Sequence, residues 1–403
     1  MGFDLNCIKN IFVSTPGAYL LDSKAGSTVS GSTSGNSSFS SLSSTLGRRH
    51  QGKVDWVSAG KKAFQAAKPY TAQFIGEVER PQEIDIDDAF NHADEAETMK
   101  PYEVDHEYED GNVRALLIGI NYVGTSAELS GCCNDVMQEL ATFQQTGFPV
   151  DEMAILVDDD DFPHFTDYPT RWNIIRYMAW LVKGAQEGDV LFMHYSGHGT
   201  QAKSNDRYEE YDQVICPMDY TTAGCILDND IFNILGRNLP KGVRLTVLFD
   251  CCHSGTMLDL PYIFVADGHH SHDHDDHGEE SHMKQIRNDN FCYGDILMIS
   301  GCKDAQTSAD VGNTATLGNG TAGAGGAGTQ CLTYILLNTD NLMYYDVMEL
   351  TRAMLIEKEF DQVPQLSCSK PLNMHSKFTM LKTFEIDQGM LGTLPPQVQE
   401  MYL

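Results

Sequence analysis

Apolar residues form continuous runs, rather than alternating ones, at several places between residues 113 and 300. Two clear runs lie at 243–250 and 189–196, and shorter ones lie at 113–121 and 152–157. A strand of a parallel sheet is apolar throughout because helices cover both of its faces. These runs therefore predict buried strands of a parallel sheet.

The segments between these runs carry apolar residues at helical spacing. Residues 134–148 place their apolar side chains on one face behind an Asn134 N-cap, and a second helix is expected at 170–185 behind a Thr170 N-cap. The order of strands and helices predicts an α/β fold, with a largely parallel central sheet between helices. Further helices are predicted at 229–239, 329–338 and 344–358, and further strands at 213–218 and 294–300.

Composition divides the chain along its length. Residues 1–50 contain much Ser, Gly and Thr and few large apolar residues, so a disordered, low-complexity segment is expected there. Residues 51–110, which are acidic from Glu77 onward, are interpreted as a regulatory arm or linker. The folded domain is predicted at 111–385, and residues 386–403 form a C-terminal tail.

Two inserts interrupt the predicted domain. Residues 268–283 are rich in His and Asp and could bind zinc or nickel loosely, although a solvated loop is the preferred interpretation. Residues 312–328 are rich in Gly but lack the Lys-Ser/Thr ending of a phosphate-binding loop, so a flexible active-site flap is expected instead.

Charge and cysteine usage limit the function classes. The formal net charge of -30 argues against nucleic-acid binding; it favours a cationic substrate or a divalent metal, or simply an acidic surface. The 11 cysteines include adjacent pairs but no C-x-x-C motif, which favours a reducing, intracellular compartment over disulfides or zinc. The sequence contains no run of 18 apolar residues, so it predicts no membrane-spanning helix.

The N-terminus allows two interpretations. Gly2 and Cys7 form a potential pair of acylation sites that would give peripheral membrane contact, but Asn6 stands where the myristoylation pattern requires Ser or Thr. The alternative is an ordinary frayed terminus without lipid.

Two of the predicted strands end at chemically reactive residues. His198 lies between two glycines just after one strand, and Cys252 follows the other, 54 residues further along the chain. The carboxyl ends of parallel strands lie at one edge of the sheet, so a thiol and an imidazole meet there, as a thiolate nucleophile requires. The backbone N–H groups of Gly199 and Cys252 are the expected oxyanion donors.

The sequences YSGHG (195–199) and DCCHSG (250–255) resemble the histidine and cysteine motifs of metacaspases, and the similarity extends over residues 110–380. The resemblance implies a caspase-hemoglobinase fold and a monomeric cysteine endopeptidase that is activated by calcium (Ca2+). It also implies that protein or peptide substrates are cleaved after Arg or Lys. His198 would then be the base and Cys252 the nucleophile.

The resemblance also assigns roles to acidic residues. Asp135 and Asp250 match the positions that line the specificity pocket, with Cys132 and Ser196 beside them. A carboxylate pair binds a guanidinium through charge-assisted hydrogen bonds. The matching calcium ligands are Asp212, Asp228, Asn229 and Asp259.

An acid is expected at the position of Asn229, so this chain should bind calcium more weakly than the family pattern suggests. Without the resemblance, each of these aspartates is more simply a solvated surface residue or a helix cap. Asp228 in particular could cap the helix that follows it.

Regulation and inactivity are further hypotheses. Lys284 and Arg287, like Arg48 and Arg49, are expected sites of self-cleavage because the pocket prefers basic side chains. The alternative function is a catalytically weak or inactive interaction protein that keeps the metacaspase fold and is tethered to a membrane. A legumain-like or caspase-like specificity is disfavoured by the two pocket acids.

Overall fold

The computed structural model describes residues within 54–403, one of the two units into which the chain divides. Predictions for Gly2, Cys7 and Cys252, and for most of both inserts, lie outside the described residues. Within the described part, no helix is long and apolar enough to cross a membrane. The described residues are 75–104, 108–205, 210–251, 254–265, 283–301, 310–311, 325–358, 360 and 362–403.

Eight strands form the central sheet, in the order β2-β1-β3-β7-β10-β13-β8-β9. The pairs from β2 to β10 are parallel, and the pairs from β10 to β9 are antiparallel. This confirms the predicted α/β class with a largely parallel sheet. The strands are β1 (Val113–Gly119), β2 (Glu152–Val157), β3 (Val190–Ser196), β7 (Arg244–Asp250), β8 (Tyr262–Val265), β9 (Lys284–Gln285), β10 (Asp295–Ser300) and β13 (Gln365–Cys368).

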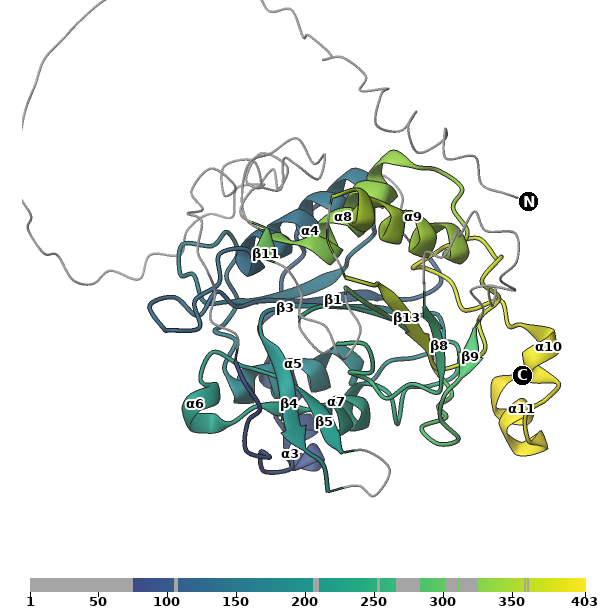
Figure 1. The fold of residues 1–403 in the computed structure, drawn as a ribbon, viewed down its shortest axis with the longest axis horizontal. Coiled ribbons are helices and arrows are strands. Elements are labelled where there is room, and N and C mark those ends of the chain that lie inside the picture. The colour runs from purple at the N-terminus through teal and green to yellow at the C-terminus, as the bar shows by residue number, and fades with distance from the viewer. Residues whose placement is uncertain are drawn as a thin grey trace, which may run out of the picture. The chain divides into compact units, whose positions relative to one another are not determined.

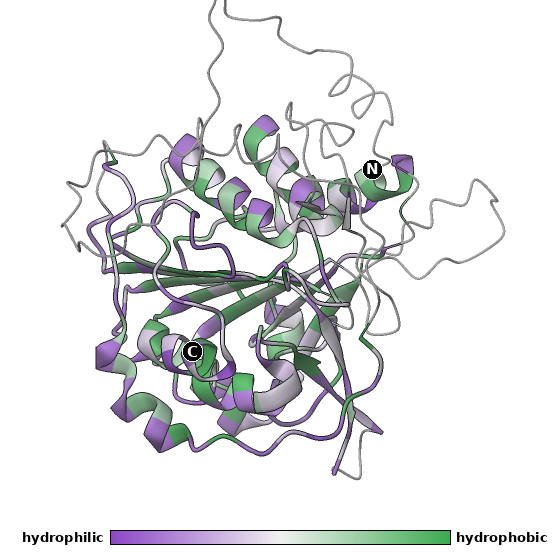
Figure 2. Cartoon of the chain, turned by 90° about the vertical axis from the view of Figure 1, so that its left-hand side faces the viewer, coloured by the Kyte–Doolittle hydropathy of each residue, from purple (hydrophilic) through white to green (hydrophobic). Residues whose placement is uncertain are grey.

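Helices cover both faces of this sheet (Figure 1). On one face lie α4 (Cys132–Thr146), α8 (Ala327–Asn338) and α9 (Tyr344–Glu357). On the other lie α3 (Ile86–Asn91), α5 (Arg171–Val182) and α7 (Asp228–Leu235). The central parallel strands between the helices are mainly apolar, as Figure 2 shows in green, because both of their faces are buried.

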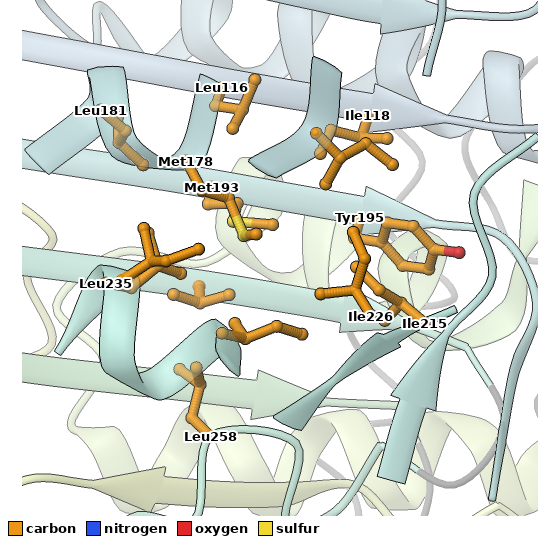
Figure 3. Close-up of a cluster of buried hydrophobic side chains, with 14 of the residues drawn as sticks. Leu116, Ile118, Met178, Leu181, Met193, Tyr195, Ile215, Ile226, Leu235 and Leu258 are labelled. Atoms are coloured by element: carbon orange, nitrogen blue, oxygen red, sulfur yellow. The ribbon is translucent and has the colours of Figure 1, made fainter. Parts of the chain in front are cut away.

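The sheet face under α5 and α7 carries one of two apolar cores. Leu116 and Met193 project from neighbouring strands and pack with Met178 of α5 and Leu235 of α7 (Figure 3). The burial of apolar surface in these two cores holds the strand ends in fixed positions. His194 of β3 is completely buried, and burial lowers its pKa to about 3, so it is a neutral core histidine.

A second, antiparallel sheet follows His198. It contains β4 (Gly199–Lys203), β5 (Tyr211–Ile215) and β6 (Ile226–Leu227) in that order. The strand predicted at 213–218 therefore begins two residues earlier and belongs to this sheet, not the central one. The remaining short elements are η1 (Ala93–Glu95), α6 (Tyr220–Ala223), β11 (Asp310–Val311), β12 (Gly325–Gly326), α10 (Gln388–Leu391) and α11 (Pro396–Tyr402).

Helix caps were predicted with mixed success. Thr170 caps α5, where its hydroxyl accepts the Asn173 N–H at 3.3 Å. The prediction for Asn134 is wrong, because α4 already begins at Cys132. The side chain of Asn121, eleven residues earlier, accepts the Cys132 N–H at 2.9 Å and so caps the helix from the end of β1.

Candidate active site

The ends of β3 and β7 lie side by side at one edge of the central sheet. Ser196 and Asp250 are register partners, and Gly197 N–H donates to the Asp250 carbonyl at 3.4 Å. The two sequence motifs therefore leave the sheet as neighbours. Cys252, two residues after Asp250, lies outside the described residues, while the side chain of Cys251 is buried in the apolar core.

His198 is buried and held by its neighbours. Its Nε2 atom lies 2.7 Å from the carbonyl oxygen of Ala127, which can only accept a hydrogen bond. The proton therefore sits on Nε2, and Nδ1 is the basic nitrogen. Burial lowers the pKa of His198 below its ordinary value, and the bond to Ala127 offsets part of this effect. The imidazole is thus oriented and neutral, as a proton acceptor must be.

Two tyrosines support the turn that carries His198. The Tyr122 hydroxyl accepts the His198 N–H at 2.9 Å, and the Tyr195 hydroxyl donates to the His198 carbonyl at 2.9 Å. The Tyr122 hydroxyl also donates to the carbonyl of Cys216 at 2.5 Å, and the Tyr195 hydroxyl oxygen lies 3.1 Å from the same carbonyl oxygen. The backbone of His198 is therefore fixed by buried groups from β3 and from the ends of β1 and β5.

The acid pair, Asp135 of α4 and Asp250 of β7, lies beside this edge of the sheet. Ser196 Oγ donates to Asp135 at 2.7 Å, and the backbone N–H of Gly326 donates to both Asp135 oxygens at 3.0 Å. A Cβ atom on Gly326 would lie 2.2 Å from Asp250 Oδ2, so both carboxyls converge on this glycine.

The start of α8 supplies further donors to the acid pair. Gln330 Nε2 donates to Asp135 at 2.9 Å, and Thr329 N–H donates to Asp250 at 2.8 Å. Backbone N–H groups at a helix N-terminus favour negative charge. Burial and then the charge of Asp250 nevertheless raise the pKa of Asp135 well above its ordinary value. The pair is therefore short of positive charge, which a cationic ligand would supply.

Glu139 lies one helical turn after Asp135 and is also buried. Its Oε1 atom accepts the Thr333 hydroxyl at 3.4 Å. Burial, and to a smaller degree the charge of Asp250, raise its pKa to about 8. At neutral pH this carboxyl is mostly protonated.

Two other predicted site residues have structural contacts in the same region. Gly199 is the first residue of β4 and is paired with Ile215 across the small sheet. Cys132 is the first residue of α4, nearly buried, with its backbone N–H held by Asn121. These contacts fix the backbone at both positions.

Three of the predicted calcium ligands lie in or directly after strands of the small sheet, Asp212 in β5 and Asp228 and Asn229 after β6. Cationic side chains already contact two of the four predicted ligands. Asp212 of β5 is buried and forms an ion pair with Arg80, which comes from the segment before α3. Asp259 is buried and forms an ion pair with Arg287. Both aspartates thus already have a positively charged partner.

Asp228 and Asn229 open α7. Asp228 is the first residue of the helix, and Leu227 is its N-cap. The Asp228 carboxylate accepts the backbone N–H groups of Gln213 and Asn229, both at 2.7 Å. The oxygen donors suit calcium in kind. Among the described residues, however, no three His, Cys, Asp or Glu side chains are grouped to hold a metal ion.

The predicted self-cleavage residues differ in accessibility. Lys284 is exposed in β9, whereas Arg287 is partly buried and paired with both Asp259 and Asp289. Lys284 is therefore the more accessible of the two.

Sequence reasoning missed several residues of this site. Tyr122 and Ala127 lie in a loop whose sequence indicates no chemistry. Gly326 lies in the stretch interpreted only as a flexible flap, and Gln330 lies in the helix predicted to follow it. Arg80 lies in the acidic arm. Gln330 closely follows the Gly-rich run, which was the one sequence signal near this contact. That signal did not identify Asp135 as the residue to which Gln330 donates a hydrogen bond.

Comparison with known proteins identifies related chains. The family described as metacaspase, peptidase C14 domain, matches residues 113–261. Metacaspase-3 of Trypanosoma cruzi (strain CL Brener) is 55% identical over 340 residues, covering 84% of this chain and 93% of that protein. Metacaspase-3 of Trypanosoma brucei brucei is 50% identical over 357 residues, covering 87% and 97%. Inactive metacaspase-4 of the same organism is 44% identical over 342 residues, covering 85% and 95%.

Proposed function

The chain belongs to the metacaspases, a family of cysteine-type peptidases, and we propose that it cleaves peptide bonds after Arg or Lys with His198 and Cys252. The observation that carries this proposal is the orientation of His198, whose protonated Nε2 is tied to Ala127. This leaves Nδ1 to accept a proton at the sheet edge where the cysteine motif begins, at Asp250.

In the proposed reaction, His198 takes the proton of the Cys252 thiol, and the thiolate attacks the carbonyl carbon of the scissile bond. Backbone N–H groups at the strand ends, Gly199 among them, stabilise the oxyanion. The imidazolium then protonates the leaving amine, and a thioester remains. His198 next takes a proton from water, and the hydroxide hydrolyses the thioester and frees the thiol.

The preference for basic residues is supported by the acid pair. Asp135 and Asp250 are buried, lie next to the His198 strand and share the donors of α8. A guanidinium or ammonium group would neutralise the pair, whereas an acidic side chain would be repelled.

We further propose that calcium stimulates the enzyme through Asp212, Asp228, Asn229 and Asp259. The support is the carboxylate chemistry of these residues and the cations that two of them already hold. A calcium ion would supply positive charge at the same carboxylates. The residues that cleave the peptide bond, His198 and Cys252, are not among these proposed calcium ligands.

Hydrolysis of a fluorogenic peptide ending in Arg tests the proposal. We expect turnover that is abolished in Cys252→Ala, is stimulated by calcium, and is absent for the matching peptide ending in Asp. Turnover that persists in Cys252→Ala would contradict the role of this thiol.

A second candidate function is that of an inactive interaction protein with the same fold. Its support is the similarity to a relative named as inactive. Absence of turnover on any basic peptide, in folded protein with and without calcium, would favour it. Membrane tethering through Gly2 and Cys7 belongs to this candidate; vesicle flotation of the acylated chain tests it.

A further inference from the structure

Two buried cysteines face each other behind the His198 turn. Cys216 directly follows β5, and Cys225 directly precedes β6. Ile215 and Ile226 are register partners in these antiparallel strands, and their side chains lie together in Figure 3. The same register, continued by one residue, places Cys216 opposite Cys225. Their sulfur atoms are 3.6 Å apart.

This geometry suits a disulfide bond. Directly opposed residues of antiparallel strands have Cα atoms about 4.5–5.5 Å apart, which lies inside the range of about 4.4–6.8 Å found for disulfides. Closing the bond requires the sulfurs to approach to about 2.05 Å. The turn between the two cysteines includes the exposed residues Thr221–Ala223 and ends at Gly224, which has a φ of 81°. Opening of this turn would give an oxidant access to the pair.

The surroundings favour reaction at Cys225. The contact with Cys216 lowers the pKa of the Cys225 thiol, and the charge of Arg171 lowers it further, although burial acts in the opposite direction. Arg171 Nε also donates to the Cys225 carbonyl at 3.0 Å, which keeps the guanidinium close. A thiolate is the reactive form of cysteine.

Cys216 is also directly bonded to the His198 turn. Its N–H donates to the His198 carbonyl at 3.0 Å, and its own carbonyl accepts the Tyr122 hydroxyl at 2.5 Å and lies 3.1 Å from the Tyr195 hydroxyl. A displacement of Cys216 would therefore move the groups that hold His198 in place.

We propose that Cys216 and Cys225 form a reversible disulfide under oxidation by a hydroperoxide, and that this disulfide displaces the groups that hold the His198 backbone in position. The Cys225 thiolate attacks the peroxide, the O–O bond breaks, and a sulfenic acid and hydroxide form. The Cys216 sulfur attacks the Cys225 sulfur, the S–S bond forms, and the sulfenic oxygen leaves as water. In sum, two thiols and hydrogen peroxide give one disulfide and two waters.

Mass spectrometry tests the modification without any need for activity. The full chain carrying Cys252→Ala is treated with hydrogen peroxide, its remaining thiols are alkylated, and it is digested. We expect the two cysteine peptides to be joined, lighter by two hydrogen atoms than the reduced pair, and separated again by dithiothreitol. Cys225→Ser and Cys216→Ser, with folding checked by thermal melting, should each lose this product. Oxidation of other thiols without the joined product would overturn the proposal.

The effect on His198 rests on the proposed peptidase function and has a separate readout. Wild type and Cys225→Ser are compared in glutathione buffers of graded redox potential. We expect wild type to lose about tenfold or more in kcat beyond the loss in Cys225→Ser, because a mispositioned base loses much of its contribution. Cys292→Ser, which removes another buried thiol, is the matched control and should behave as wild type.

The two experiments separate the outcomes. A disulfide without a difference in activity would overturn the coupling to His198 alone. If neither protein hydrolyses any peptide, the peptidase proposal fails, and the mass spectrum still decides whether the disulfide forms.

Discussion

Tyr122 and His198 are joined twice: the Tyr122 hydroxyl accepts the His198 N–H at 2.9 Å, and their rings pack with centroids 4.8 Å apart. Tyr122→Phe keeps the ring contact and removes the hydroxyl. We expect kcat to fall about tenfold with little change in KM, and stability to fall by about 1–3 kcal/mol, because buried partners lose their hydrogen bonds.

Tyr102→Phe is the matched control, since the Tyr102 hydroxyl donates to the Phe148 carbonyl just before β2, away from the carboxyl ends of β3 and β7. It should lower the melting temperature without lowering kcat. An unchanged kcat in Tyr122→Phe would contradict the role of this hydroxyl in positioning His198.

Asp135→Asn removes one charge from the acid pair. We expect KM for an Arg peptide to rise by about tenfold to a hundredfold, which corresponds to a charge-assisted hydrogen bond of about 1.5–3 kcal/mol. Asp340→Asn, an exposed change of the same type, should leave KM unaltered. Equal loss of affinity in both variants would argue against a cation site at Asp135.

The same carboxyl makes substrate binding depend on pH. Because the pKa of Asp135 is raised, the carboxyl takes up a proton at a higher pH than an ordinary aspartate. We therefore expect KM for the Arg peptide to increase as the pH falls through this raised pKa. Steady-state kinetics at several pH values measure it, and a KM that stays constant down to the ordinary pKa of Asp would refute the expectation.

Gly326→Ala places a methyl group against the acid pair, 2.2 Å from Asp250 Oδ2 and 2.4 Å from its Cγ. The contact is with a buried side chain that Thr329 holds, so α8 must shift. We expect a stability loss of about 1–3 kcal/mol and a higher KM. Gly76→Ala, with open space around the new Cβ atom, is the control. Chemical denaturation measures the difference, and equal stability of the two variants would count against the close approach.

Glu139→Gln should stabilise the protein, and more so at high pH. The folded pKa is about 8, above the ordinary value of 4.5, so the unfolded chain binds fewer protons between these values. The contribution of Glu139 to the free energy of unfolding is therefore largest below about pH 4.5 and declines as the pH rises toward 8. Gln keeps an oxygen for Thr333 but cannot ionise. Urea unfolding should show a gain of a few kcal/mol at pH 8 and a much smaller gain at pH 5. A pH-independent gain would contradict the buried, protonated state.

Arg80→Gln removes the cation that pairs with Asp212. The arm around Arg80 also contacts β4, where Val78 N–H donates to the Gln201 carbonyl at 3.0 Å. If calcium and Arg80 compete for Asp212, calcium affinity measured by calorimetry should rise severalfold, and the arm should be cut faster by a protease. Arg237→Gln, at an exposed helix end, is the control. Unchanged or weaker calcium binding would rule out the competition.

Several features of this protein followed from local patterns. The continuous apolar runs identified β1, β2, β3, β7 and β10, because a strand covered on both faces leaves that signature at every position. The position of His198 at the carboxyl-end edge of the central sheet was also predicted from the sequence, since the carboxyl ends of parallel strands lie at one edge. The added antiparallel strands β8, β9 and β13 were missed because they contain only two to four residues each. β8 and β9 directly flank the His-rich insert.

The contacts that make the candidate site were decided only by the tertiary structure. Gly326 and Asp135 are 191 positions apart in the chain, and Arg80 and Asp212 are 132 apart. Asn121, not Asn134, caps α4, because the Asn121 side chain accepts the N–H of Cys132, the first residue of the helix. Apolar periodicity reports which face of an element is buried, but it does not identify the buried partner. For this chain, therefore, the sequence determined the buried parallel strands and the family. The folding of distant segments onto one another determined which groups hold His198 and the acid pair.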